Sequence, residues 1–254
     1  MTPNVAIVRQ FARAVLADRL LGDELTRLAL TKAELDPQAD PEDPRDLIRA
    51  FLRTWRFAAD KDKTPAALFS DTSLLEALPA PPDEGRLMLL LVDAIGFSSE
   101  DAATILAPMK TDAAEALSEG RKILTEPRSG STAIIIEDEP LIAAELLSIL
   151  ERMGVSVGGY AKTAAKAVAL ANRTQPDVIL ADYNLEDGET GADAVEQIHN
   201  FHSCPVIFIT GFPEKVLSGE GVEPDFVISK PYRVDAVRAA VAHCLDARVP
   251  VLAD

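Results

Sequence analysis

Five polar side chains in the second half of the chain have types and positions suited to phosphoryl transfer. Each lies at the end of a short apolar run. They are Glu137 and Asp138, Asp182, Thr210, and Lys230. A carboxylate can accept a phosphoryl group once a metal ion and a cation offset the charge growing on the transferred group. The pattern therefore predicts an acyl-phosphate site, with Asp182 as acceptor, Lys230 as the cation and Thr210 as the hydroxyl donor.

The three acidic residues of this set also predict a metal site. Glu137, Asp138 and Asp182 would form a cluster of like charges, which is costly unless a hard divalent cation neutralises it. Magnesium is held by one or two carboxylates together with waters and phosphate oxygens. We therefore expect Mg²⁺ to be the cofactor.

The apolar runs are the strands that must position these groups. Strands are expected near 133–137, 155–160, 177–181, 205–210 and 225–229, each followed by a helix. This alternation predicts a five-stranded parallel α/β unit. Ligands of open parallel sheets bind at the carboxyl ends of the strands, so the polar residues should converge there.

Residues 132–247 resemble the receiver domain of two-component response regulators, a doubly wound fold of the flavodoxin or CheY type. The resemblance implies that Asp182 is the phosphoacceptor, Thr210 the switch hydroxyl and Lys230 the phosphate partner. It further implies that Glu137, Asp138 and Asp182 bind the metal, together with the backbone carbonyl of Asn184. Many receivers carry an aromatic residue three positions before the lysine. Val227 stands there in this chain, so the usual aromatic relay is not expected.

Composition indicates two domains of low affinity for polyanions. The chain has 254 residues, 25 of them basic and 41 acidic, for a net charge of −16. Net negative charge opposes binding to nucleic acid and to anionic membranes. The N-terminus lacks a basic flank with a long apolar run, and no stretch approaches the roughly 20 apolar residues of a membrane span. We therefore expect a cytoplasmic location.

The first half is predicted to be all-α, because its apolar residues recur at helical spacing. Residues 4–57 form a first helical group and 73–124 a second, with a long connection at 58–72. The predicted domains are thus 1–124 and 132–254, joined by a linker at 125–131. His199 and His202 are expected to be exposed residues at a helix end.

The second helical group has the pattern of a helix–turn–helix. Gly96 can end a buried helix in the left-handed conformation, and Ser98 can cap the next one. The helix after the turn, expected at 109–124, carries three basic and three acidic residues. Arg121 and Lys122 lie near its C-terminus, whereas DNA-reading helices contact bases through their N-terminal part. The shape is that of a DNA-binding motif, but the charge is not.

This helix–turn–helix resembles the promoter-reading domain of extracytoplasmic-function sigma factors, and residues 1–57 resemble, more weakly, their core-binding region. A sigma-like domain that precedes a receiver is similar to the PhyR family of general stress regulators. That resemblance implies an anti-anti-sigma factor. Phosphorylation at Asp182 by a sensor histidine kinase would expose the sigma-like domain, which would bind an anti-sigma factor of the NepR type and free a sigma factor. No enzymatic activity is expected beyond self-phosphorylation and acyl-phosphate hydrolysis.

Two alternatives remain open from the residues alone. A DNA-binding response regulator would read a promoter with the helix–turn–helix near 85–124, although the charge balance opposes this. An RNA-binding antiterminator would need aromatic residues for base stacking, and only 5% of the residues are aromatic.

Overall fold

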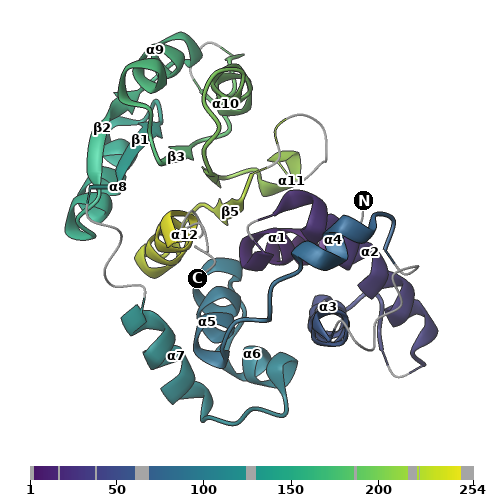
Figure 1. Cartoon of the computed structure of the whole chain (residues 1–254). Coiled ribbons are helices and arrows are strands. Elements are labelled where there is room, and N and C mark those ends of the chain that lie inside the picture. Colours follow the sequence, from purple (N-terminus) through teal and green to yellow (C-terminus); the bar gives the residue numbers. More distant parts are fainter. Residues whose placement is uncertain are drawn as a thin grey trace. The chain divides into compact units, whose positions relative to one another are not determined.

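The computed structural model describes residues 3–16, 18–37, 39–60, 69–123, 130–185, 188–216, 222 and 224–246. The chain divides into two compact units, 1–122 and 123–254, each considered by itself below (Figure 1). Most of the linker expected at 125–131 lies outside the described residues. No helix in the described part of the chain is long and apolar enough to cross a membrane.

The described part of the first unit is helical, as its apolar spacing predicts. The elements are α1 (Pro3–Leu16), α2 (Arg19–Leu35), α3 (Pro44–Ala59), α4 (Thr72–Ala77), α5 (Glu84–Leu89), the π-helical turn η2 (Leu90–Ile95), α6 (Ser99–Leu106) and α7 (Ala113–Ile123). Asp18 caps α2 and Asp43 caps α3, each through a side-chain oxygen that accepts a backbone N–H. Pro44 in the first turn of α3 adds a fixed φ that suits a helix start.

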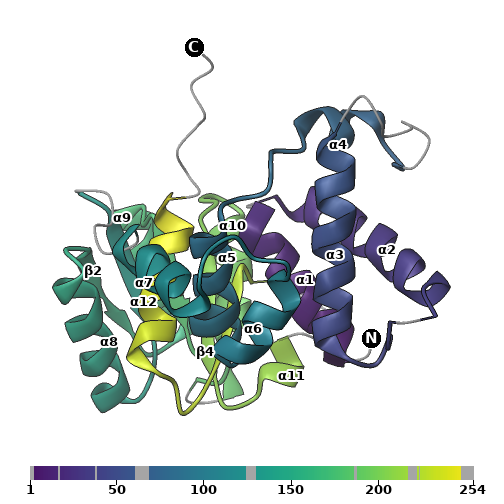
Figure 2. The ribbon, with the colours of Figure 1, turned by 90° about the horizontal axis from the view of Figure 1, so that it is seen from below.

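Helices α1, α2 and α3 pack against one another, and Figure 2 shows the long α3 beside α1. The interface is aromatic: the Phe11 and Phe51 rings meet edge to face at 5.9 Å, as do those of Phe51 and Trp55. Trp55 is fully buried, and its indole N–H donates to the carbonyl oxygen of Pro79 at 2.9 Å. One side chain of α3 is thus bonded to the segment between α4 and α5.

Two helices joined by a turn, α6 and α7, lie where the helix–turn–helix is expected, and the second helix starts later than expected. Gly96 ends η2 with φ 97°, and Ser98 caps α6 by accepting the Asp101 N–H. Both assignments are confirmed. The last helix begins at Ala113 rather than near 109. Asp112 caps it by accepting the Ala114 N–H, and Glu84 accepts the Lys110 N–H ahead of it. The buried helix expected before Gly96 starts as α5 and continues as a π-helix from Leu90, which its apolar residues did not reveal.

The second unit is a five-stranded parallel sheet in the order β2-β1-β3-β4-β5. The strands are β1 (Thr132–Ile136), β2 (Ser156–Ala161), β3 (Val178–Ala181), β4 (Val206–Thr210) and β5 (Phe226–Ser229). The helices are α8 (Pro140–Arg152), α9 (Ala164–Thr174), α10 (Gly191–His199), α11 (Pro213–Val216) and α12 (Val234–Asp246). Helices α8 and α12 pack together on one face of the sheet, and α9 and α10 on the other (Figure 1). The predicted α/β class and strand positions are confirmed.

The central strands are buried on both faces, which accounts for their continuous apolar runs. Every residue of β3 and of β4 is buried. The strand order reverses between β1 and β3, where ligands of doubly wound sheets bind. This point of the sheet is where Glu137 and Asp182 emerge.

Candidate phosphorylation and metal site

The structure brings together four of the six residues assigned to the site from the sequence. Glu137 and Asp138 follow β1, Asp182 follows β3, and Lys230 follows β5. Backbone bonds extend the sheet by one residue and so fix these positions. The Glu137 N–H donates to Ala161 O at 2.9 Å, and the Asp182 N–H donates to Ile136 O at 2.8 Å.

Lys230 connects two of the carboxylates. Its Nζ donates to Glu137 Oε2 at 2.9 Å and to Asp182 Oδ2 at 2.7 Å. Glu137 is completely buried and Asp182 is 8% exposed. Burial raises the pKa of Glu137, although Lys230 opposes the shift. Burial by itself would lower the pKa of Lys230, but the hydrogen bonds to Asp182 and Glu137 raise it overall. The ammonium group therefore stays charged beside the candidate acceptor.

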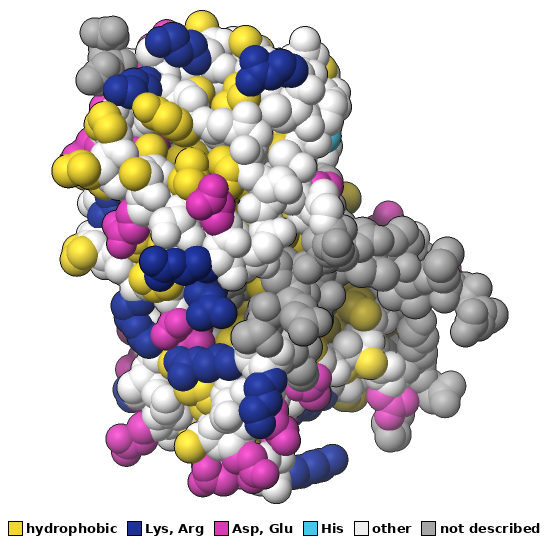
Figure 3. All heavy atoms as spheres, turned by 90° about the vertical axis from the view of Figure 1, so that its left-hand side faces the viewer, with side chains coloured by type: hydrophobic (Ala, Val, Ile, Leu, Met, Phe, Trp, Pro, Cys, Tyr) yellow, Lys and Arg dark blue, Asp and Glu magenta, His cyan; other side chains and the backbone are white. Residues whose placement is uncertain are grey.

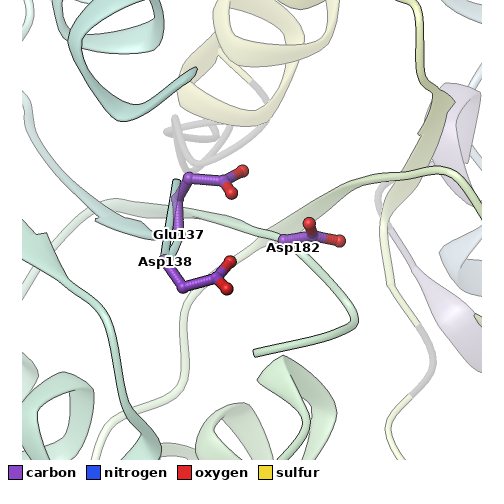
Figure 4. A group of neighbouring side chains, drawn as sticks. All are labelled: Glu137, Asp138 and Asp182. Atoms are coloured by element: carbon purple, nitrogen blue, oxygen red, sulfur yellow. The ribbon is translucent and has the colours of Figure 1, made fainter. Parts of the chain in front are cut away.

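The pocket holds more negative charge than Lys230 can offset. Ligand oxygens of Glu137, Asp138 and Asp182 all lie within 4.8 Å of one another. Figure 4 shows Glu137 and Asp138 on one strand end and Asp182 beside them on its neighbour. Three carboxylates at this spacing fit one hard divalent cation. The donor set, oxygen without sulfur or imidazole, favours magnesium or calcium over softer metals.

Thr210 is the last residue of β4, and Asn184 follows β3. Thr210 is fully buried at the end of β4, and its Oγ1 accepts the Phe212 N–H at 3.1 Å. The Lys230 N–H donates to the Thr210 carbonyl oxygen at 2.8 Å, which joins these two residues through the backbone. The Asn184 N–H points at Asp182 Oδ1, at a long 3.4 Å. Asn184 thus lies against the candidate acceptor, and Thr210 is joined by its backbone to Lys230.

Gly191 is a residue of this site that sequence reasoning missed. A Cβ added there would overlap the backbone carbonyl oxygen of Asp182, so α10 can begin against the acceptor strand only with glycine. The Gly191 N–H also donates to Tyr183 O at 2.8 Å. Thr190 caps this helix through a complete capping box with Asp193. A helix that starts with glycine straight after a Thr cap was the available signal, since glycine is a poor helix former.

The residue three positions before Lys230 is a buried valine rather than an aromatic residue. Val227 is buried in the core cluster on the α9 and α10 side of the sheet. Its neighbour Phe226 meets the ring of His243 edge to face at 5.6 Å. The Phe226 ring therefore packs against α12, and the side chain at position 227 is aliphatic.

The expectation for the two helix-end histidines was wrong. His199 and His202 are half-buried rather than exposed. Their Nε2 atoms bond to carbonyl oxygens, His199 to Cys204 at 3.0 Å and His202 to Pro176 at 2.7 Å. These bonds fasten the turn before β4, a structural use that the polar surroundings of the histidines did not indicate.

In the helical unit, Arg121 of α7 is bonded to a buried acidic residue. Arg121 Nε and Nη2 donate to the two carboxylate oxygens of Asp93, each at 2.7 Å. Asp93 is only 3% exposed. On the face drawn in Figure 3, Lys and Arg side chains are interspersed with Asp and Glu. A guanidinium held by a buried carboxylate is poorly placed to bind a phosphate of DNA.

Comparison with known proteins extends these observations over the whole chain. Residues 133–242 match the response regulator receiver domain. The phyllosphere-induced regulator PhyR of Methylorubrum extorquens is 34% identical over 250 residues, which cover 95% of this chain and 91% of that protein. The crystal structure of the response regulator PhyR from Brucella abortus superposes with a TM-score of 0.75 at 33% identity, covering 96% of this chain and 92% of that one.

A further solved relative is the anti-anti-sigma factor PhyR from Bartonella quintana. It is 30% identical, with a TM-score of 0.76 over 96% of this chain and 93% of that one. These relatives share both units with this chain, in the same order. The chain therefore belongs to the PhyR family of response regulators.

Proposed function

We propose that this chain is a phosphorylation-controlled anti-anti-sigma factor. Phosphorylation of Asp182 by a sensor histidine kinase makes the helical unit available to an anti-sigma factor of the NepR type, which then releases a sigma factor for stress transcription. The proposal depends on one observation: a helical unit precedes a receiver with a carboxylate-rich pocket, and a PhyR relative aligns with both over 95% of the chain. The Bartonella quintana relative is itself an anti-anti-sigma factor.

In this proposal the residues of the pocket have distinct roles. Glu137, Asp138, Asp182 and the carbonyl group of Asn184 hold Mg²⁺, which offsets negative charge on the transferred phosphoryl group. An Asp182 carboxylate oxygen attacks the phosphorus of the donor while the bond from phosphorus to the leaving group breaks. Lys230, already bonded to Asp182 Oδ2, pairs with a phosphoryl oxygen. The Thr210 hydroxyl donates to another.

The helical unit acts through its shape rather than through DNA contact. We assign residues 1–57 as the region that resembles the sigma core-binding part and 73–124 as the helix–turn–helix part, with 132–254 as the receiver. The near-neutral last helix and the Arg121–Asp93 pair support a surface that binds protein. Any catalysis is limited to the transfer onto Asp182 and the hydrolysis of the acyl phosphate.

The deciding experiment measures binding of a NepR-type anti-sigma factor to the full chain by calorimetry, with and without Mg²⁺ and a small phosphodonor. We expect the donor to tighten binding in the wild type and to have no effect on Asp182→Ala. A matched control is Asp177→Ala, at the other end of the same strand, where Asp177 Oδ2 accepts the Thr132 N–H at 2.9 Å. This control should keep the response to the donor.

Two outcomes would contradict the proposal. Binding that ignores the phosphodonor in the wild type would remove the control by phosphorylation. Salt-dependent affinity for duplex DNA without binding to the anti-sigma factor would favour the DNA-binding regulator instead.

A further inference from the structure

Glu189 links the loop after the candidate phosphoacceptor to a different helix. Its Oε2 accepts the backbone N–H of Ala164, the first residue of α9, at 2.9 Å. The residue lies between β3 and α10, seven positions after Asp182. A side chain of the acceptor loop is thus tied to the start of the helix that follows β2.

The backbone of the same loop is closed on Asp182. The Leu185 N–H donates to Glu189 O at 3.1 Å, and Asn184 pairs with Thr190 in an antiparallel bridge. Gly191 then packs directly on the Asp182 carbonyl oxygen. A shift of Glu189 would therefore be passed to Asn184 by way of Leu185 and Thr190.

The electrostatics of the α9 start favour a carboxylate at this position. The first turn of a helix has unsatisfied N–H groups and a partial positive charge. Thr163 caps α9 weakly, since its Oγ1 lies 3.4 Å from the Lys166 nitrogen. Glu189 satisfies another of these N–H groups, and it is not one of the three clustered carboxylates.

We propose that Glu189 is a positioning residue for the metal site: through its bonds to Ala164 and Leu185 it holds Asn184 so that Asn184 and Asp182 can bind Mg²⁺ together. This inference rests on the proposed function, in which those residues bind Mg²⁺. Without the tie, the loop must be ordered at the moment of binding, and that ordering cost reduces affinity.

The test is Mg²⁺ calorimetry on the full chain in four forms: wild type, Glu189→Ala, Glu189→Gln and Asp225→Ala. Loss of one hydrogen bond predicts a three- to tenfold weaker affinity, on the order of its net worth, for Glu189→Ala. Glu189→Gln keeps an acceptor oxygen and should stay within about twofold of the wild type. Asp225 is the matched control, because its Oδ2 accepts the Val206 N–H at 2.8 Å at the opposite end of the sheet.

A second readout follows the bond itself. In ¹⁵N–¹H spectra recorded without metal, the Ala164 amide should shift strongly in Glu189→Ala and little in Asp225→Ala. Thermal unfolding should show similar small losses for both alanine variants, while only Glu189→Ala weakens Mg²⁺ binding.

The outcomes separate this inference from the proposed function. Mg²⁺ binding in the wild type with equal affinity in Glu189→Ala would overturn the role of Glu189 alone. Equal weakening in Asp225→Ala would also overturn it, because a general loss of stability would then explain the effect. Absence of Mg²⁺ binding in the wild type would overturn the metal site and this inference together.

Discussion

The two units each contain a buried carboxylate paired with a cation, but the balance of charge differs. In the helical unit, one buried carboxylate, Asp93, receives two bonds from one guanidinium, Arg121. In the receiver pocket, one ammonium group, Lys230, bonds to two carboxylates, with a third nearby. A balanced pair satisfies itself and holds structure. A surplus of like charge costs stability and fits a site that recruits a cation.

The largest expected effect is on the balanced pair. Arg121→Ala removes the cation that offsets buried Asp93, and breaking a buried pair costs about 3–5 kcal/mol. Because the Arg121 side chain is 42% exposed, we expect a loss nearer to about 2–3 kcal/mol. Urea unfolding would measure it. The double variant Asp93→Leu with Arg121→Met should recover most of the loss, and no recovery would show that the pair does more than balance charge.

Removal of the Lys230 ammonium group should lower the free energy of unfolding by a smaller amount, and Mg²⁺ should reverse the loss. Lys230→Ala leaves Glu137 and Asp182 without their shared ammonium group. Burial already raises the pKa of Glu137, so Glu137 can take up a proton in the variant, and we expect this to limit the loss to about 1–2 kcal/mol without metal. Mg²⁺ should restore most of it, whereas Mg²⁺ should not rescue Arg121→Ala. Melting temperatures with and without Mg²⁺ test this, with exposed Lys166→Ala as the control. Equal responses of the two variants to Mg²⁺ would erase the contrast between the units.

Another carboxylate of the helical unit, Glu24, extends the comparison to pH. Hydrogen bonds from Arg27 and from the Ser70 N–H hold the pKa of Glu24 down at about 2, against an ordinary value of 4.5. A lowered pKa in the folded state means that the stabilisation is present above pH 4.5 and is lost as pH falls toward 2. Since Arg27 is 54% exposed, we expect about 1 kcal/mol.

Glu24→Gln provides the check on this acid dependence. Its stability should fall less steeply than that of the wild type between pH 4.5 and pH 2, as measured by urea unfolding at a series of pH values. Identical slopes for the two proteins would mean that the balanced pair around Glu24 adds nothing to acid sensitivity.

The smallest effect on stability is expected when one of the surplus negative charges of the receiver pocket is removed. Asp182→Asn keeps an acceptor oxygen and reduces repulsion with Glu137 and Asp138, so stability without metal should change by less than about 1 kcal/mol. The same variant should lose its response to Mg²⁺ and phosphodonor. A large loss of stability would indicate that Asp182 is part of a balanced structural pair.

The receiver could be predicted closely because its strands are buried on both faces. Their apolar runs mark both the strands and the residues that follow, so Glu137, Asp182 and Lys230 could be located from the sequence. The π-helical turn at Leu90–Ile95 could not, since apolar residues all round a helix carry no information on its hydrogen-bond period.

The supporting residues of the site were also beyond the sequence. Gly191 and Glu189 act through close approach and through a bond to a distant helix, and neither leaves a periodic pattern. The partner of Arg121 could not be predicted either, because Asp93 lies 28 residues away in the sequence.

The way α7 is held has a consequence for local unfolding. Among its described residues, Ala116, Leu117 and Gly120 are the buried ones, and Gly120 lies against Gly85 of α5. Polar bonds add to this contact: Asp93 holds Arg121 of α7, and Glu84 accepts the N–H groups of Lys110 and Thr111 just before the helix. A helix with so little apolar area should open on its own, and its amides should exchange with deuterium well before those of α3. That exchange should quicken with added salt, which weakens the charged attachments, while exchange in the aromatic core around Trp55 stays slow.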